Sequence, residues 1–337
     1  MGFKIGRLMF FTFVLANFAS AQDIHWSQFD RNPIYSNPGN SGNFNGTYRF
    51  VGGYRNQWKS VSVPYESIYL SADGMLPFEK IKDFGGGISL LQDDAGDGKF
   101  TTFEVQTNLS RPVRLPFLPD LFLSPGINLG INYRQFNPQA FTFDNQFNGF
   151  EFDPNLGTGE VFAAQQKTNI SIGIGAAFSQ SLFGDQQLSG GLAFFNLNRP
   201  NQGFFGQKIK RDVRTNFNLQ YSYPINSDLI LLPSININKQ GKFDELIIGS
   251  QIKYIVLQKA GLYRALYGGL HFRSRDAFFV RAGIDYQNWH LGVSYDINIS
   301  QLTPASNVRG GLEVFIQYIL FQYKPKNVNH RICPDYI

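Results

Sequence analysis

The side chains most suited to binding a metal ion lie in the acidic run from Asp93 to Phe100, which Glu104 follows. Aligned with a calcium-binding loop, Asp93 takes the first ligand position, Asp97 the fifth and Glu104 the twelfth. Ala95 takes the third position and offers no oxygen ligand. The flanking segments alternate as strands do, so the run is better interpreted as a tight acidic turn between two strands.

The histidines and the remaining charged residues form no recognisable catalytic arrangement. The sequence contains no G-x-S-x-G, H-E-x-x-H or phosphate-binding loop. Four histidines are present, and none is paired at metal-ligand spacing: His25, His271, His290 and His330. Charged residues on the polar faces of predicted strands are Arg134, Glu104, Glu313, Asp285 and Asp296. We therefore expect a protein that is not an enzyme and that holds no cofactor and no metal ion.

The elements that would position these side chains are β-strands of one kind. From Thr168 to Phe178, isoleucine, alanine and phenylalanine alternate with asparagine, serine and glycine. Successive side chains of a strand point to opposite faces, so the pattern predicts a sheet with one apolar and one small, polar surface. About ten residues is also the length of a tilted strand that crosses a bilayer.

This pattern recurs from Thr47 to Phe321 and predicts an all-β fold, a transmembrane antiparallel β-barrel of about 14 strands in the outer membrane. The 34 Phe, 16 Tyr and 3 Trp residues suit the aromatic girdles of such a barrel. The alternative is a soluble β-sandwich, which the small polar face disfavours. The predicted strands lie near 47–58, 63–72, 85–92, 100–110, 121–136, 168–178, 188–198, 211–222, 228–238, 244–256, 264–275, 277–287, 289–299 and 307–321.

The chain divides into four parts by composition. Residues 1–21 resemble a signal peptide cleaved after Ala21, with Lys4 and Arg7 before an apolar stretch. Residues 22–46, called the leader below, are polar and rich in Asn, Gly and Pro, and could be disordered, a periplasmic cap or a plug. Residues 47–323 form the predicted barrel, and 324–337 a C-terminal periplasmic tail. Loss of the signal lowers the net charge from +5 to +3, which is too mild to indicate nucleic-acid binding.

An even number of strands places both ends of the barrel in the periplasm and the connection 137–167 outside. This long connection carries six phenylalanines among polar residues, and they could either contact a protein partner or fold into the barrel mouth. They are Phe141, Phe143, Phe147, Phe150, Phe152 and Phe162.

Three stretches together resemble the PorP/SprF family of Bacteroidota outer-membrane proteins of type IX secretion and gliding. The first is Gln22-Asp23, Ser27-Gln28-Phe29 and the pairs Asn32-Pro33 and Asn37-Pro38. The second comprises Tyr54, Arg55, Asn56, Gln57 and Trp58. The third runs from Ser294-Tyr295-Asp296 to Arg309-Gly310-Gly311, and Cys333-Pro334 follows.

The resemblance implies a barrel that binds proteins in the outer membrane. Its expected partners are outer-membrane lipid, the C-terminal domain of a secreted adhesin and periplasmic components of the secretion machinery. The candidate partner-binding residues are the two Asn-Pro pairs, residues 54–58 and five of the loop phenylalanines, Phe141, Phe143, Phe147, Phe150 and Phe152. Asn-Pro pairs also make turns, and Trp58 suits a girdle. The alternative function is a diffusion channel or small-molecule transporter.

Overall fold

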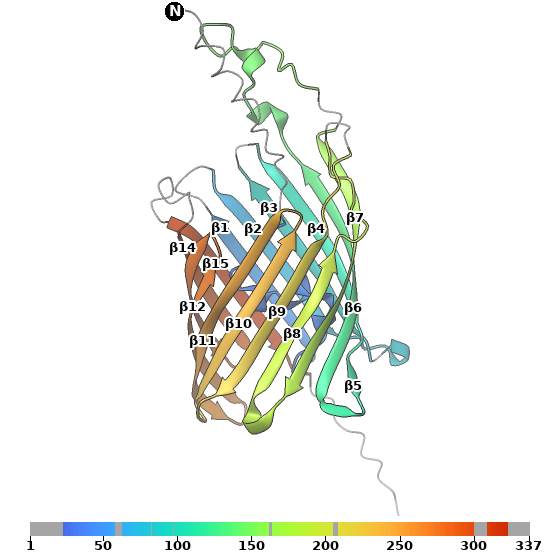
Figure 1. Ribbon diagram of the computed structural model, residues 1–337, viewed down its shortest axis with the longest axis vertical. Helices are drawn as coiled ribbons and strands as arrows, with labels where there is room; N and C mark the ends of the chain where they lie inside the picture. Colours follow the sequence, from blue (N-terminus) through green and yellow to red (C-terminus); the bar gives the residue numbers. More distant parts are fainter. Residues whose placement is uncertain are drawn as a thin grey trace, which may run out of the picture.

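The computed structural model describes residues 23–57, 63–81, 83–96, 98–161, 164–204, 208–299 and 309–322. It is an antiparallel β-barrel (Figure 1). The strands are β1 (Tyr48–Gln57), β2 (Tyr65–Met75), β3 (Gly85–Ala95), β4 (Phe100–Ser110), β5 (Val113–Leu115), β6 (Leu118–Gln135), β7 (Gln166–Ser181), β8 (Gln187–Phe195), β9 (Arg214–Pro224), β10 (Leu229–Gln240), β11 (Phe243–Lys259), β12 (Leu262–Arg273), β13 (Ala277–Tyr286), β14 (Trp289–Asn298) and β15 (Arg309–Leu320).

Fourteen of these strands form the wall, because β4 pairs directly with β6 and β1 pairs with β15 to close the barrel. The short strand β5 only extends the turn before β6. The predicted transmembrane barrel of about 14 strands is thereby confirmed. A strand was not predicted between Arg111 and Asp120, where β5 lies.

The alternation along each strand separates a lipid-facing surface from the lumen. On β7, Ile170, Ile172 and Ile174 are exposed on the outside, whereas Ser171 is buried on the inside. Apolar side chains on the outer face suit the hydrocarbon core of a bilayer. No helix in the described ranges is long and apolar enough to cross a membrane.

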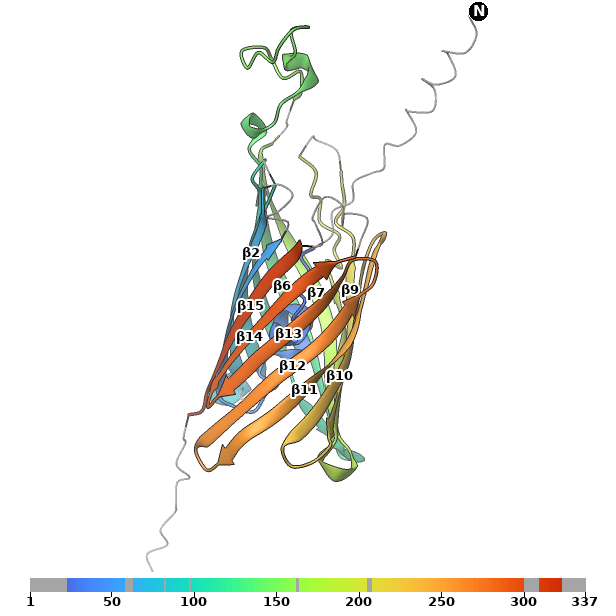
Figure 2. The ribbon, with the colours of Figure 1, turned by 90° about the vertical axis from the view of Figure 1, so that its left-hand side faces the viewer.

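The two ends of the barrel differ in their connections. At the end called the loop end below, residues 136–165 join β6 to β7 and residues 196–213 join β8 to β9. At the opposite, turn end, β13 and β14 are joined by two residues, Gln287 and Asn288. The connection 136–165 rises far above the wall in both views (Figures 1 and 2).

Residues 23–46 of the leader lie inside the barrel (dark blue in Figure 1). Asp23 lies near the loop end, and Thr47 bonds to Leu320 at the turn end, so the leader runs down the lumen before β1 begins. Its short helices are η1 (Phe29–Arg31), α1 (Pro33–Ser36) and η2 (Pro38–Asn40). Proline begins α1 and η2, a position where its missing N–H costs no helical hydrogen bond.

Further short 3₁₀ turns lie in the connections: η3 (Glu79–Ile81), η4 (Pro138–Ala140), η5 (Asp144–Gln146) and η6 (Phe183–Asp185). The predicted signal peptide, Trp58, Phe162, Cys333 and the C-terminal tail 324–337 lie outside the described residues.

Candidate functional site

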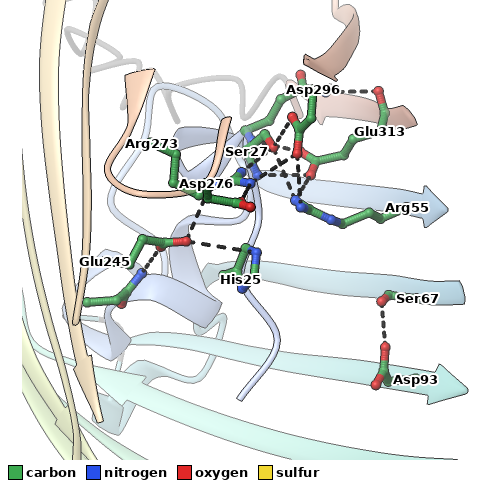
Figure 3. Close-up of polar contacts among 12 residues, drawn as sticks. His25, Ser27, Arg55, Ser67, Asp93, Glu245, Arg273, Asp276, Asp296 and Glu313 are labelled. Atoms are coloured by element: carbon green, nitrogen blue, oxygen red, sulfur yellow. Dashed lines mark hydrogen bonds and ion pairs between the residues drawn. The ribbon is translucent and has the colours of Figure 1, made fainter. Parts of the chain in front are cut away.

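A buried cluster of charged side chains joins the leader to the seam where β1 meets β15, and is called the seam cluster (Figure 3). The Arg55 guanidinium lies 2.9 Å from Glu313 and 3.1 Å from Asp296. The second arginine of the cluster, Arg273 on β12, lies 3.0 Å from Asp296. The cluster comprises Ser27, Gln28, Arg55, Arg273, Asp296 and Glu313.

The leader completes the hydrogen bonding of the two carboxylates in this cluster. The backbone N–H groups of Ser27 and Gln28 donate to Glu313 over 2.9 and 2.6 Å. The Ser27 hydroxyl donates to Asp296 over 2.8 Å. Buried carboxylates are stable only when paired and hydrogen-bonded, so the leader and the wall depend on each other here.

A second ionic contact holds the start of the leader near the loop end. Asp23 lies 2.7 Å from Arg211, which comes from the connection between β8 and β9. Arg211 also lies 3.3 Å from Glu104 on β4. Burial alone would lower the pKa of the Arg211 guanidinium, but these two carboxylates raise that pKa above its ordinary value. Arg211 therefore stays charged and ties the leader to a loop and a strand.

The middle of the leader touches the backbone of the wall. The Asn37 side-chain amide donates to the carbonyl oxygens of Ala176 on β7, over 2.9 Å, and of Leu192 on β8, over 3.3 Å. A Cβ atom at Gly175 or Gly191 would lie only 2.4 Å from the Asn37 side chain. Glycine on these two strands therefore makes room for the leader.

Aromatic packing adds an apolar contact between leader and wall. The ring of Trp26 packs edge-on against Phe315 on β15, with centroids 5.1 Å apart, and Tyr35 packs against Tyr69 on β2 at 5.9 Å. Each buried aromatic pair of this kind contributes about 0.5–1.5 kcal/mol beyond area burial.

A cavity lies on each side of the leader. The larger, about 780 Å³, lies towards the turn end, and its lining includes Phe29, Ser36, Asn40, Phe178 and Asn218. The smaller, about 400 Å³, lies towards the loop end, and its lining includes Asp23, Tyr35, Asp93, Glu104 and Arg134. The leader thus lies in the lumen between these two cavities.

The candidate residues from the leader are mostly buried contacts to the wall or within the leader. Asn32 accepts a hydrogen bond from Ser36 over 3.1 Å, and Pro33 begins α1. Asn37 and Pro38 pack against β6 and β7. Asn32, Asn37 and Pro38 are buried, whereas Pro33 is half-buried and lines the cavity at the turn end. A role of these residues in partner binding stays a prediction.

The second stretch, on β1, splits between the two faces of the wall. Arg55 points into the seam cluster, whereas Tyr54 points outward and its hydroxyl donates to Glu66 over 3.0 Å. Asn56 also donates to Glu66, over 2.9 Å. Gln57 lines the smaller cavity at the loop end. The three stretches that carried the resemblance thus meet in one cluster, through Ser27, Arg55 and Asp296.

The phenylalanines of the long connection that the structure describes lie away from the lumen. Phe147, Phe150 and Phe152 are 58, 96 and 47% exposed. Phe141 and Phe143 pack against each other nearer the wall, with centroids 6.4 Å apart. Among the described residues, Arg211 of the connection between β8 and β9 is a buried side chain that reaches the lumen.

Asp93 and Asp94 of the acidic run have other partners, and Asp97 lies outside the described residues. Asp93 accepts from Ser67 over 2.6 Å, and Asp94 accepts from Thr101 over 2.5 Å. Within the described ranges, no three His, Cys, Asp or Glu side chains gather as they would around a metal ion. Asp93 and Asp94 belong to β3, so the predicted turn is shorter than the acidic run.

Sequence reasoning did not single out Arg211, Arg273 or Arg281 as functional residues. Arg281 on β13 lies 2.6 Å from Asp30 of the leader. The sequence could have indicated Arg273 and Arg281 as lumen residues, because each is a charged residue on the polar face of an alternating strand. Such a residue needs a counter-charge when buried, and here the leader and neighbouring strands supply it.

Comparison with known proteins gives a family and a fold. The family model described as "Type IX secretion system membrane protein PorP/SprF" matches residues 18–318. No curated protein matches the chain.

Among solved structures, the Ralstonia pickettii toluene transporter TbuX is 10% identical, with a TM-score of 0.50 over 86% of this chain and 93% of that chain. A Pseudomonas aeruginosa FadL homologue is 11% identical, with a TM-score of 0.42 over 85% and 93%. At 10% identity, the likeness to TbuX shows the barrel fold alone. Because the family model spans most of the sequence, the chain belongs to the PorP/SprF family of type IX secretion system membrane proteins.

Proposed function

We propose that this barrel is a non-enzymatic binding protein of the type IX machinery that holds or helps deliver a large secreted surface protein, an adhesin, through its C-terminal domain. The observation that supports this most directly is the exposed phenylalanine group of the loop-end connection: Phe147, Phe150 and Phe152. Long connections of outer-membrane barrels face the outside, where a secreted protein would be held.

The tip of this connection is organised by its own hydrogen bonds. The Asn148 side chain accepts from the backbone N–H groups of Phe150 and Glu151, over 2.9 and 3.0 Å. Phe147 and Phe152 form an isolated β-bridge across the same turn. Because the backbone of this turn is fixed before binding, it loses less conformational entropy when a partner covers its phenylalanines.

The occupied lumen favours binding over transport. A diffusion channel needs a continuous polar path, whereas the leader crosses this lumen and is fixed by the seam cluster and by Asp23. At the turn end, we expect contact with periplasmic components of the machinery.

The test is affinity purification of the tagged full-length protein from native membranes, followed by mass spectrometry. The triple substitution of Phe147, Phe150 and Phe152 by serine should abolish recovery of a large secreted protein. Phe183→Ser is the matched control, because this side chain is 95% exposed at the turn end. Steady conductance in a planar bilayer together with no recovered secreted protein would overturn the proposal in favour of a channel.

A further inference from the structure

The lipid-facing wall has an apolar hollow of about 520 Å³ where β4, β6, β7 and β8 lie side by side, called the β6–β7 hollow. Small or short outward side chains, Pro125 and Ala176, line its floor. Larger apolar side chains surround them: Leu109, Ile127, Ile174, Leu192 and Phe194. The hollow therefore offers an apolar groove to the membrane.

The wall behind the hollow carries glycine on its inner face, because the leader lies directly against the backbone there. Gly126 and Gly175 face the lumen behind the hollow, and a Cβ at either position would collide with the leader at Pro38 or Asn37. The wall is thus one backbone layer, with the leader on its inner side and the hollow on its outer side. Ala176 contacts both sides, because its side chain lines the hollow and its carbonyl oxygen accepts a hydrogen bond from the Asn37 side chain.

A cation lies at the turn-end rim of this hollow. Arg111 directly follows β4, and its backbone N–H donates to the Pro125 carbonyl over 2.9 Å. Its guanidinium carbon lies 5.4 Å from the ring centroid of Phe84, which also lines the hollow. An arginine beside an aromatic ring at a membrane interface is well placed to bind a phosphate.

A second hollow on the same surface provides a comparison. The β1–β2 hollow measures about 540 Å³ and is also apolar. Its turn-end side chains are Trp289 and Tyr318, and no basic residue is among those that line it. The two hollows therefore match in size and differ in charge.

We propose that the β6–β7 hollow is a specific site for one phospholipid of the periplasmic leaflet. One acyl chain lies over Pro125 and Ala176, and the phosphate pairs with Arg111. Apolar contact along the chain supplies the affinity, at about 0.8 kcal/mol per buried CH₂ group, and the arginine selects a phosphate-bearing headgroup.

Native mass spectrometry of the full-length barrel, titrated with dioleoylphosphatidylethanolamine or with dioleoylglycerol, tests this. The wild-type protein should bind a first molecule of the phospholipid more tightly than any further molecules of it. It should bind dioleoylglycerol more weakly than the phospholipid. Arg111→Ala should weaken phospholipid binding about fivefold, the equivalent of about 1 kcal/mol per basic residue at a membrane surface. Arg114→Ala is the charge-matched control, because Arg114 is also exposed at the turn end but does not line the hollow.

A second pair of variants tests the groove itself. Ala176→Leu fills the β6–β7 hollow and should weaken binding of both lipids, whereas Ala72→Leu fills the β1–β2 hollow and should leave the first bound phospholipid unchanged. Equal effects of the two arginine substitutions, or of the two alanine substitutions, would overturn the assignment. Equal affinity for the two lipids would also overturn it, because the phosphate would then play no part.

Discussion

Substituting Arg55 by methionine is expected to loosen the leader while leaving the barrel folded. The Arg55 side chain is 1% exposed, and it is the cation that contacts both Glu313 and Asp296. Arg273 still contacts Asp296 after the substitution, but Glu313 loses its nearest cation. Removing one partner of a buried ion pair typically costs about 3–5 kcal/mol, since the remaining charge stays buried without compensation.

The amide hydrogens of Ser27 and Gln28 report this change directly, because both donate to Glu313. A loss of about 3–5 kcal/mol should raise their opening equilibrium by about 10²-fold to about 4 × 10³-fold. Hydrogen exchange measured by mass spectrometry on the folded, detergent-solubilised protein is a suitable assay. Exchange along the wall strands should change little, because their ladders do not depend on Arg55.

The control is Arg199→Met at the loop end. Arg199 pairs with Asp212 over 2.8 Å, but its side chain is 51% exposed, and such a pair contributes about 0–1 kcal/mol. The double variant Arg55→Met/Glu313→Gln removes the unpaired charge and should regain part of the protection. If Arg55→Met exchanged no faster than Arg199→Met, the seam cluster would not hold the leader and the reasoning would be refuted.

Two further predictions concern the leader as a whole. Gly191→Val should displace Asn37 and lower the free energy of unfolding by about 1–3 kcal/mol, as overpacking does. Gly268→Ala is the control and should leave the free energy of unfolding unchanged, because no atom lies within 4 Å of the added Cβ. Thermal unfolding of both variants measures the difference. Deleting residues 23–46 should give regular conductance steps in a planar bilayer where the wild-type protein gives few, because the deletion removes the segment that crosses the lumen.

The wall could be predicted from sequence because its signal is local. Alternation from Thr168 to Phe178 predicted a strand that the structure extends to β7, Gln166–Ser181. Each strand must place apolar residues outside, so the pattern repeats with every crossing. The strand β5 escaped prediction, since its three residues pair only with the start of β6 and carry no alternation of their own.

The position of the leader could not be predicted, because the contacts that fix it join residues far apart in the chain. Ser27 and Glu313 are separated by 286 residues, and Asp23 and Arg211 by 188. Composition alone left a cap, a plug and disorder as alternatives. Buried charges on the wall need partners, and this requirement favours the plug over a cap or a disordered segment. A short-range sequence pattern does not contain this information.

The seam cluster also links the leader to the closure of the barrel. Arg55 and Glu313 are direct register partners on β1 and β15, the first and last strands of the wall. Without the leader, the Glu313 carboxylate would lose two N–H donors inside the lumen. The leader also begins near the loop end and enters β1 at the turn end, so docking after closure would require threading it through a finished barrel. Docking as β1 meets β15 avoids both costs, so we expect the leader to dock while the barrel closes and not afterwards.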